Sequence, residues 1–352
     1  MLAPDAVSVV RSKRLCATVL LGDARERLKD IPAGAVDAVI CDPIYPEVDR
    51  NFGRISVRDW KFMMVDVVRE VRRILKPTGS AMFVIQPNSE HIGRMRPWAF
   101  EFMAWLAKDW NLIQDVWWWN YAAMPTLHTS RAYGLMRPSI KACVWVGARD
   151  CYRNQDEVLW ERAESTATDK RINRSQVDYK PSGHHQRQGR ALQTSLVRGG
   201  STPYNVIPCA NTDNTNSSGA KGHGAGTPYK LADWWVRYIC PPNGIVVDPF
   251  CGAGTIGEAA LAAKRRFIGI DIDPTFVEIA SATCVRTGTK GKADERVGSD
   301  DRSDSEDCVQ HEVGDLSESA LGAELGTVGE AEFGASAGVD SGRVDDPATL
   351  EG

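Results

Sequence analysis

Apolar residues along the chain fall into two patterns, short continuous runs and longer segments with helical spacing. The continuous runs are bounded by polar or turn-forming residues and predict buried strands. They lie at 16–22, 36–42, 80–86, 116–120, 140–147, 244–248 and 266–271. The segments with helical spacing predict amphipathic helices and lie at 57–75, 96–110, 256–264 and 274–285. Because strands and helices alternate, the sequence predicts an α/β fold, with a mainly parallel sheet and helices on both faces.

Two stretches break this alternation. Residues 149–222 are polar, lack periodic apolar positions and carry many basic side chains, so they predict an irregular basic insert. Residues 287–352 are rich in Gly, Ser, Asp and Glu and nearly lack aromatic residues, which predicts an acidic disordered tail. The expected order is an N-terminal extension, a first α/β half, the insert, a second α/β half and the tail. These parts are residues 1–15, 16–148, 149–222, 223–286 and 287–352.

Charge is distributed unevenly between the tail and the rest of the chain. The 352 residues carry a formal net charge of −4, from 42 Lys and Arg and 46 Asp and Glu. Residues 291–352 hold seventeen of the acidic and four of the basic residues, a net of −13, so residues 1–290 carry about +9. A basic body suits a polyanionic partner, although an ordinary soluble enzyme can carry the same charge.

Composition also bears on location and on metal binding. No apolar run reaches the roughly 18 residues that span a bilayer, and the N-terminus lacks a signal-like apolar block, so we expect a cytoplasmic protein. The nine cysteines are scattered and never spaced as CxxC, so neither a zinc site nor a disulfide framework is indicated. We expect reduced thiols and no metal.

A glycine-rich loop follows the predicted strand at 244–248. Gly252, Gly254 and Gly257 form a G-x-G-x-x-G pattern between a strand and a helix, and Asp271 ends the next strand nineteen residues after Gly252. Such glycines let the backbone approach a ligand, and the acid can accept hydrogen bonds from ribose hydroxyls, so the loop predicts a nucleoside cofactor. Asp248, directly before the loop, would repel a diphosphate and favour a cationic ligand. This charge favours S-adenosylmethionine over a nicotinamide dinucleotide.

A second polar segment follows the strand at 36–42. The sequence CDPIYPE (41–47) holds an aromatic residue between two prolines. A turn explains the prolines and the acids, because proline cannot continue a sheet ladder and aspartate favours turns, but a turn does not explain the large aromatic. Asp42 and Tyr45 each precede a proline and are therefore biased toward extended backbone.

These two segments resemble the paired motifs of one enzyme family. DPFCGAGT (248–255) resembles the cofactor-binding motif of the amino-group DNA methyltransferases, and CDPIYP resembles their catalytic Asp-Pro-Pro-Tyr motif, with Ile44 at the second proline. The order of the motifs resembles the β group of that family. The resemblance implies a Rossmann-like class I methyltransferase fold with a circularly permuted sheet. It covers roughly residues 16–148 and 222–286.

The approach to the glycine loop also resembles the family. In GHGAGTPYK, His223 and Pro228 match the family's His-Pro-Thr-Gln-Lys-Pro segment, whereas Thr227 stands at the lysine position. We therefore carry over only the two matching residues.

The resemblance implies a role for each matching residue. A base amine is a weak nucleophile because its lone pair is delocalised, and acceptors aimed at its N–H groups favour attack on the sulfonium methyl. The implied acceptors are the Asp42 carboxylate and the Pro43 carbonyl, while Tyr45 would stack on a base flipped out of the duplex. The implied cofactor-binding residues are Asp248 at the methionine ammonium, Phe250, Gly252, Gly254 and Thr255 around the pocket, Asp271 at the ribose, and also Asp23 and His223. An acid that starts a helix explains Asp23 equally well.

The basic insert is the expected region of DNA recognition, because phosphates attract Arg and Lys and Arg can read guanine. The candidate DNA-binding residues are Arg171, Arg174, Arg187 and Arg190. A solvated loop is the alternative interpretation of the insert.

We therefore expect an S-adenosylmethionine-dependent methyltransferase of a restriction-modification type that acts on double-stranded DNA as a monomer or homodimer. Asp rather than Ser at the head of the catalytic motif leans toward adenine N6 within the family. The alternatives are cytosine N4 methylation, an NAD-dependent oxidoreductase that uses the glycine loop, and a DNA-binding module whose catalysis is impaired by Ile44.

Overall fold

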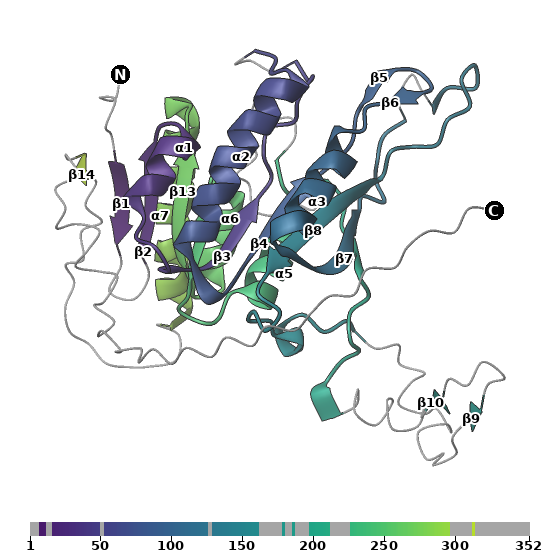
Figure 1. Ribbon diagram of the computed structural model, residues 1–352. Helices are drawn as coiled ribbons and strands as arrows, with labels where there is room; N and C mark the ends of the chain where they lie inside the picture. Colours follow the sequence, from purple (N-terminus) through teal and green to yellow (C-terminus); the bar gives the residue numbers. More distant parts are fainter. Residues whose placement is uncertain are drawn as a thin grey trace, which may run out of the picture. The chain divides into compact units, whose positions relative to one another are not determined.

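A ten-stranded mixed sheet forms the centre of the fold (Figure 1). The structure, a computed structural model, describes residues 7–11, 16–49, 53–125, 129–161, 178–179, 185–186, 197–211, 226–295 and 312–313. The strand order in the sheet is β11-β7-β8-β4-β3-β12-β13-β2-β1-β14. The strands are β1 (Val7–Arg11), β2 (Cys16–Leu21), β3 (Val36–Cys41), β4 (Leu75–Ile85), β7 (Asn111–Trp119), β8 (Ile140–Gly147), β11 (Val206–Pro208), β12 (Ile245–Asp248), β13 (Arg266–Asp271) and β14 (Glu312–Val313). Outside this sheet, β5 (Ser89–His91) pairs with β6 (Arg94–Met95), and β9 (Asp178–Tyr179) pairs with β10 (His185–Gln186).

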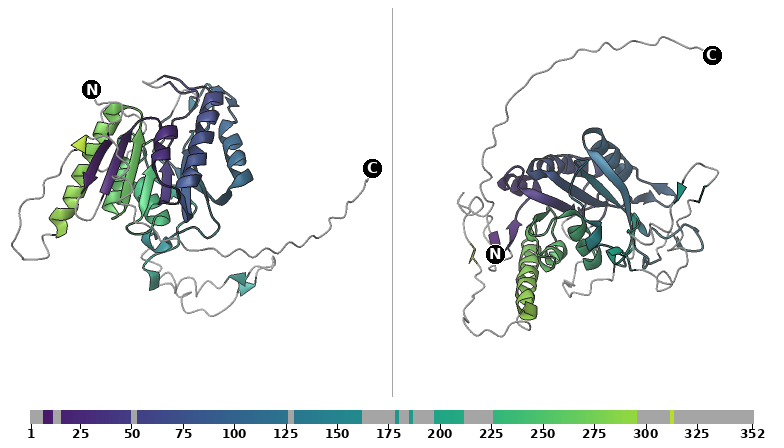
Figure 2. Two further views of the ribbon diagram at one scale, coloured as in Figure 1. Left: turned by 60° about the vertical axis from the view of Figure 1, so that its left-hand side comes forward. Right: turned by 90° about the horizontal axis from the view of Figure 1, so that it is seen from below.

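Helices cover both faces of the sheet. The first three α-helices lie on one face and the last three on the other, as the view from below shows (Figure 2). The first group is α1 (Ala24–Arg27), α2 (Val57–Ile74) and α3 (Trp98–Asp109), and the second is α5 (Tyr229–Ile239), α6 (Thr255–Ala262) and α7 (Pro274–Glu295). The short 3-10 turns η1 (Leu28–Asp30) and η3 (Gln155–Glu157) complete the helical elements used below.

Helix α2 illustrates how the sequence pattern becomes structure. Its buried residues Trp60, Met64, Val67 and Val71 recur every three or four positions and so share one face. The helix begins after Ser56, whose hydroxyl accepts a hydrogen bond from a backbone N–H of the first turn at 3.1 Å. The result is an anchored helix that follows the CDPIYPE segment in the chain.

The parallel strands end together at one edge of the sheet. Strands β4, β3, β12, β13 and β2 run parallel, whereas β8 is antiparallel to both β4 and β7. Val247 pairs with Val39, and Asp248 pairs with Gly269, so β3 and β13 end within about two residues of the level at which β12 ends. Ligands of open α/β sheets bind at this carboxyl edge. The fold thus brings the ends of the two motif-bearing strands together.

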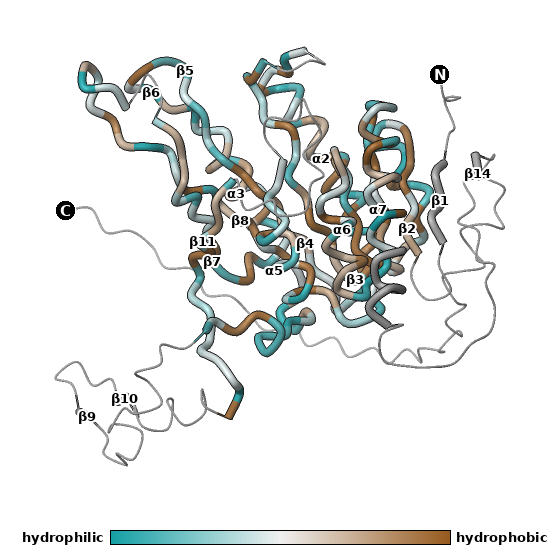
Figure 3. The backbone as a smooth tube through the Cα atoms, turned by 180° about the vertical axis from the view of Figure 1, so that it is seen from behind, coloured by the Kyte–Doolittle hydropathy of each residue, from teal (hydrophilic) through white to brown (hydrophobic). Residues whose placement is uncertain are grey.

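The core lies between the sheet and its helices. The largest fully buried side chains include five tryptophans, Trp60, Trp98, Trp118, Trp145 and Trp235. Figure 3 shows apolar residues along the central strands, and every residue of β3 is buried. In β7 the exposed fraction alternates, since Trp118 is 0% exposed and its neighbour Trp119 is 44% exposed.

The predicted α/β class with a mainly parallel sheet is confirmed, but the bounds of several elements differ. The strand expected at 80–86 starts earlier, because β4 begins at Leu75, directly after α2 ends at Ile74. Leu75 pairs with Val36, and a register shift before Ser80 accommodates the extra residues. Gly79 fits there because a Cβ would lie 3.0 Å from the Val36 carbonyl oxygen.

Differences also occur at the two ends of the chain and before the glycine loop. Helix α7 ends at Glu295 rather than near residue 285, because each residue added to an anchored helix gains a hydrogen bond without a new nucleation step. Two residues of the predicted disordered tail form β14, which pairs with β1, a strand within the expected extension 1–15. The sequence pattern also missed α5.

The described residues contain no helix long and apolar enough to cross a membrane. The same residues contain no group of three or more His, Cys, Asp or Glu side chains that could hold a metal ion. Eight cysteines lie in the described part of the chain, and all are free thiols.

Candidate active site

Asp42 stands directly after β3 and accepts hydrogen bonds from two hydroxyl groups. The Tyr45 hydroxyl donates to Oδ1 at 3.0 Å, and the Thr227 hydroxyl donates to Oδ2 at 2.9 Å. Both donors are neutral hydroxyls, so they fix the orientation of the carboxyl group without adding a positive charge beside it. Asp42 and Tyr45 are partly exposed, whereas Thr227 is buried.

The backbone around Asp42 is held by side chains from α2 and from the connection between β4 and β5. The Trp60 indole N–H donates to the Ile44 carbonyl, and the Asn88 amide donates to the Pro46 carbonyl, both at 2.6 Å. No described residue donates a hydrogen bond to the Pro43 carbonyl oxygen. A loop whose neighbouring carbonyls are occupied therefore leaves the Pro43 carbonyl available as an acceptor.

Tyr45 lies near an aromatic ring and near a cation. Its ring centroid is 6.0 Å from that of Trp98 and 5.7 Å from Lys141 Nζ. Burial raises the pKa of the Tyr45 hydroxyl well above its ordinary value, and the negative charge of Asp42 adds to the shift. The hydroxyl therefore stays protonated at neutral pH and acts as a donor to Asp42.

The glycine loop contains positions at which only glycine fits without strain. Gly252 has φ of 49° and Gly254 has φ of 83°, both in the left-handed region. A Cβ on Gly257 would lie 2.5 Å from a ring carbon of Phe267, so this glycine lets α6 pack against β13. Thr255 is the first residue of α6, at the end of the loop.

Asp248 is a buried carboxylate without a cationic partner among the described residues. It is 2% exposed and accepts one hydrogen bond, from the Phe250 backbone N–H at 3.1 Å. Burial raises the pKa of Asp248 well above its ordinary value, and the nearby negative charges of Asp42 and Asp271 raise it further, against a lowering effect of the Phe250 N–H. A ligand cation placed here would reverse that shift, so the residue suits the ammonium of S-adenosylmethionine.

Asp271 joins the end of β13 to the glycine loop. Its Oδ2 accepts the Gly252 backbone N–H at 2.8 Å, and its Oδ1 accepts the Asp273 N–H at 2.9 Å. Its backbone carbonyl accepts the Gly22 N–H at 2.9 Å. The carboxylate is therefore fixed beside the glycine loop, at the end of β13.

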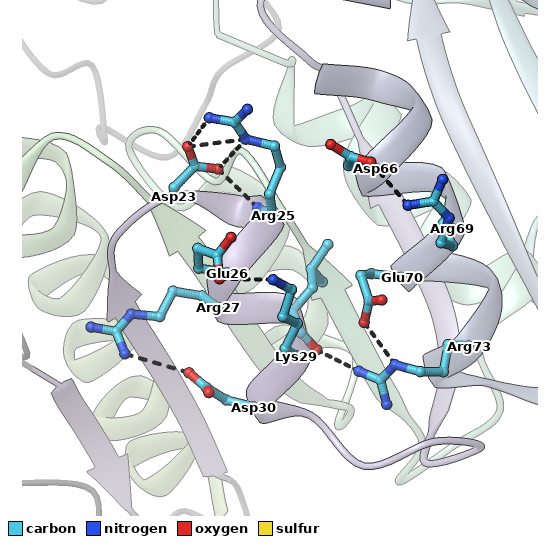
Figure 4. A network of polar contacts seen from close by, with 11 residues as sticks. Asp23, Arg25, Glu26, Arg27, Lys29, Asp30, Asp66, Arg69, Glu70 and Arg73 are labelled. Atoms are coloured by element: carbon cyan, nitrogen blue, oxygen red, sulfur yellow. Dashed lines mark hydrogen bonds and ion pairs between the residues drawn. The ribbon is translucent and has the colours of Figure 1, made fainter. Parts of the chain in front are cut away.

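Asp23 caps helix α1, as the alternative interpretation of the sequence expected. Its side chain accepts the Arg25 backbone N–H at 2.9 Å and pairs with the Arg25 guanidinium at 2.6 Å, as Figure 4 shows. The hydrogen bond from the Arg25 side chain lowers the pKa of Asp23. Its predicted contact with the cofactor stays a prediction.

The same view shows how α1 and η1 are attached to α2. Arg73 pairs with Glu70 and also donates to the Leu28 carbonyl at 2.9 Å (Figure 4). This hydrogen bond attaches η1, in the segment after β2, to helix α2, and its role is structural.

The structure brings most of the predicted site residues to one edge of the sheet. They are Asp42, Pro43, Tyr45, Asp248, Phe250, Gly252, Gly254, Thr255, Asp271 and Asp23. The other predicted residues, His223, Arg171, Arg174, Arg187 and Arg190, lie outside the described residues.

Two further residues at this edge were missed by the sequence pattern. Thr227 contacts Asp42, although the two residues are 185 positions apart in the chain. The only feature of the sequence that drew attention to Thr227 was that the family's segment has lysine at this position. Lys141, at the start of β8, places Nζ 4.3 Å from the Trp118 ring centroid and 5.7 Å from that of Tyr45. Nothing in the apolar run at 140–147 indicated this position.

Known proteins are similar to this chain in sequence and in fold. A model of the N6/N4 DNA methylase family matches residues 36–282. The chain is 26% identical over 272 residues to the DNA adenine methyltransferase YhdJ of Escherichia coli (strain K12), an alignment that covers 74% of this chain and 80% of that protein. It is 23% identical over 278 residues to the type II methyltransferase M.PvuII of Proteus hauseri, covering 74% and 81%. A solved structure of PvuII DNA methyltransferase (cytosine-N4-specific) aligns with a TM-score of 0.58 at 18% identity, covering 76% of this chain and 86% of that chain.

The strand order, the single antiparallel strand β8 within the β4-to-β7 region and the glycine loop at the carboxyl edge define a class I methyltransferase fold. Since the family model spans most of the chain, the protein belongs to the N6/N4 DNA methylase family. It is a DNA methyltransferase that uses S-adenosylmethionine, as the sequence predicted.

Proposed function

We propose that this protein methylates the N6 amine of adenine at a specific DNA sequence, with Asp42 and the Pro43 carbonyl accepting the N–H groups of a flipped base. The observation that carries the proposal is the Asp42 loop. A charged carboxylate oriented by two neutral donors stands beside a carbonyl to which no described residue donates a hydrogen bond. Such preorganised acceptors favour the pyramidal amine that attacks a methyl group.

The residues around Asp42 do the positioning. S-adenosylmethionine supplies an electrophilic methyl on a sulfonium, which leaves as a neutral thioether when the amine nitrogen forms its new bond. Asp42 and Pro43 hold the amine in line with the methyl, and the extra proton on nitrogen leaves through the acceptor at Asp42 or to water. Metal chemistry is not needed in this scheme.

Tyr45 and Lys141 serve the flipped nucleotide in this proposal. The Tyr45 ring offers a stacking surface, which is worth roughly 1–3 kcal/mol per base. Lys141 supplies a positive charge beside that ring, at 5.7 Å from its centroid, where a phosphate of the target strand can pair with it. The insert at 149–222, with its arginines, is the proposed reader of the recognition sequence.

The cofactor residues follow from charge and geometry. Asp248 would hold the methionine ammonium, and Asp271 the ribose. Phe250, the Gly252–Gly254 backbone and Thr255 would line the pocket between them. Asp23 and His223 complete the proposed set.

Adenine is proposed because Asp heads the catalytic motif and because the relative YhdJ is named a DNA adenine methyltransferase. Cytosine N4 is the second candidate, since the fold also resembles a protein described as cytosine-N4-specific. A cytoplasmic location and a monomeric or dimeric state stay predictions.

Expression in a host that lacks DNA methylation, followed by single-molecule sequencing, tests the proposal. We expect N6-methyladenine in one sequence context, and none with the Asp42→Ala variant as the matched control. N4-methylcytosine in the same experiment would favour the second candidate. Folded protein that binds NADH but not S-adenosylhomocysteine, and leaves DNA unmodified, would overturn the assignment.

A further inference from the structure

The Asp42 carboxylate is held from two directions that are unrelated in sequence. Tyr45 donates to Oδ1 from within the same loop, three residues away. Thr227 donates to Oδ2 from the segment that leads into α5, 185 residues away. Each carboxylate oxygen therefore carries one hydroxyl donor, and each keeps a further lone pair for a substrate N–H.

The position of Thr227 is fixed by the packing of α5. Thr227 is 8% exposed and immediately precedes Pro228, the residue that caps the start of α5. The helix buries Leu231, Ala232 and Trp235 in the core cluster that also contains Ala38 and Ile40 of β3. The hydroxyl is thus held relative to β3 by a rigid element rather than by a loose loop.

We propose that Thr227 is a positioning residue for methyl transfer, which acts by holding Asp42 in the orientation that accepts the target amine. This inference rests on the proposed function. The χ2 torsion of an aspartate is broad and roughly two-fold, so a carboxylate with a single donor rotates easily. Two donors on different oxygens fix the plane of the carboxylate and direct its free lone pairs to one place.

The chemistry of the donor matters as much as its position. A hydroxyl fixes the carboxylate without cancelling its charge, whereas an ammonium at the same distance would neutralise it. Thr227 therefore leaves Asp42 a strong acceptor for the amine and for the proton that it must lose.

Single-turnover kinetics with wild-type protein, Thr227→Val and Thr227→Ser test this role. Valine keeps the shape and removes the donor, so we expect the rate of methyl transfer to fall about tenfold to a hundredfold, as for loss of a hydrogen bond to a charged group. The KM for S-adenosylmethionine and its affinity in calorimetry stay at the wild-type values. Serine restores the donor and returns the rate to within about threefold of the wild type.

A matched control and a second pair of variants separate positioning from folding. Thr287→Val removes a hydroxyl that donates to the Thr283 carbonyl within α7 and leaves the transfer rate unchanged. Because Tyr45 and Thr227 hold the same carboxylate, the loss in Tyr45→Phe/Thr227→Val differs from the product of the single losses by about twofold or more. Thr227→Ala serves as the donor-free variant if the valine protein does not fold.

The outcomes are distinct. A Thr227→Val rate within about twofold of the wild type, or an equal loss in Thr227→Ser, overturns the positioning role. Independent effects of Tyr45→Phe and Thr227→Val also overturn it. If the wild-type protein itself transfers no methyl group to DNA, the proposed function fails instead, and this result is seen before any variant is measured.

Discussion

Replacing Asp248 with asparagine separates the stability of the free protein from its ability to bind cofactor. In the free protein the carboxylate is 2% exposed and has one described donor, the Phe250 N–H. Its pKa is raised well above 3.8, first by burial and then by the charges of Asp42 and Asp271. The ionised side chain therefore destabilises the folded state until a cation is bound.

The sign of the pH dependence follows from this shift. Below the ordinary pKa both folded and unfolded chains are protonated, and Asp248 contributes nothing. Between the ordinary and the raised pKa the unfolded chain loses its proton first, so the free energy of unfolding falls as pH rises, by up to about 1.4 kcal/mol per pH unit. Above the raised pKa the full penalty is present. The Asp248→Asn protein lacks this slope.

Cofactor binding has the opposite dependence on pH. The ammonium binds the ionised carboxylate, so affinity falls as pH drops through the raised pKa and binding releases a proton. Asparagine removes the charge, and loss of a charge-assisted hydrogen bond of about 1.5–3 kcal/mol weakens binding roughly tenfold to a hundredfold.

Urea unfolding at stepped pH values between about 5 and 8 measures the slope, and calorimetry with S-adenosylhomocysteine measures affinity. Titration in two buffers with different heats of ionisation counts the protons released. Asp150→Asn, at an exposed position, is the matched control and changes neither quantity. The reasoning is refuted if Asp248→Asn has the same pH slope as the wild type, or binds cofactor equally tightly with the same proton release.

Three further predictions test other parts of the site. Ile44→Pro keeps the backbone carbonyl that accepts the hydrogen bond from the Trp60 indole, and it removes a backbone N–H to which no described residue offers an acceptor. We therefore expect the rate of methyl transfer to equal that of the wild type or to rise. A large loss would mean that the loop depends on Ile44. In filter binding at several salt concentrations, Lys141→Met lowers the affinity for DNA and reduces the salt dependence of binding by about one counterion, while the affinity for the cofactor is unchanged. The control Lys108→Met, beside the amino ends of β3 and β4, has no such effect. Gly257→Ala forces a Cβ to 2.5 Å from Phe267 and destabilises the fold by about 1–3 kcal/mol in thermal unfolding, while Gly288→Ala, whose Cβ meets nothing within 4 Å, does not.

The elements with clean local signals were predicted closely. The run at 140–147 became β8 and the run at 266–271 became β13, because a continuous apolar run between polar residues has few other solutions. The helix expected at 57–75 ends one residue earlier, at Ile74. Errors occurred where neighbouring strands decide the outcome, as at Leu75, whose entry into β4 depends on pairing with Val36.

In the candidate site, too, some residues were indicated by local sequence patterns and others were not. The positions of Asp42, Asp248 and Asp271 at the carboxyl edge were predictable because each ends or directly follows an apolar strand and stands in a recognisable local pattern. The donor at Thr227 and the cation at Lys141 depend on contacts between segments far apart in the chain. No local pattern contains such a contact, so these residues became visible only when the sheet order was known.

The acids of this fold can be sorted by the charge of the groups that hold them. Asp23 is paired with Arg25, and Asp37 with Lys76 at 2.9 Å, so their charges are already compensated by the protein. Asp42 is held by two hydroxyls, and Asp248 by a backbone N–H, so none of these donors compensates the carboxylate. The two acids at the carboxyl edge that have only neutral donors, unlike Asp23 and Asp37, therefore carry negative charge that the protein does not compensate when they are ionised. That negative charge favours a cationic cofactor, and the positive charge of a bound cofactor would in turn lower the repulsion between these carboxylates and an approaching DNA strand.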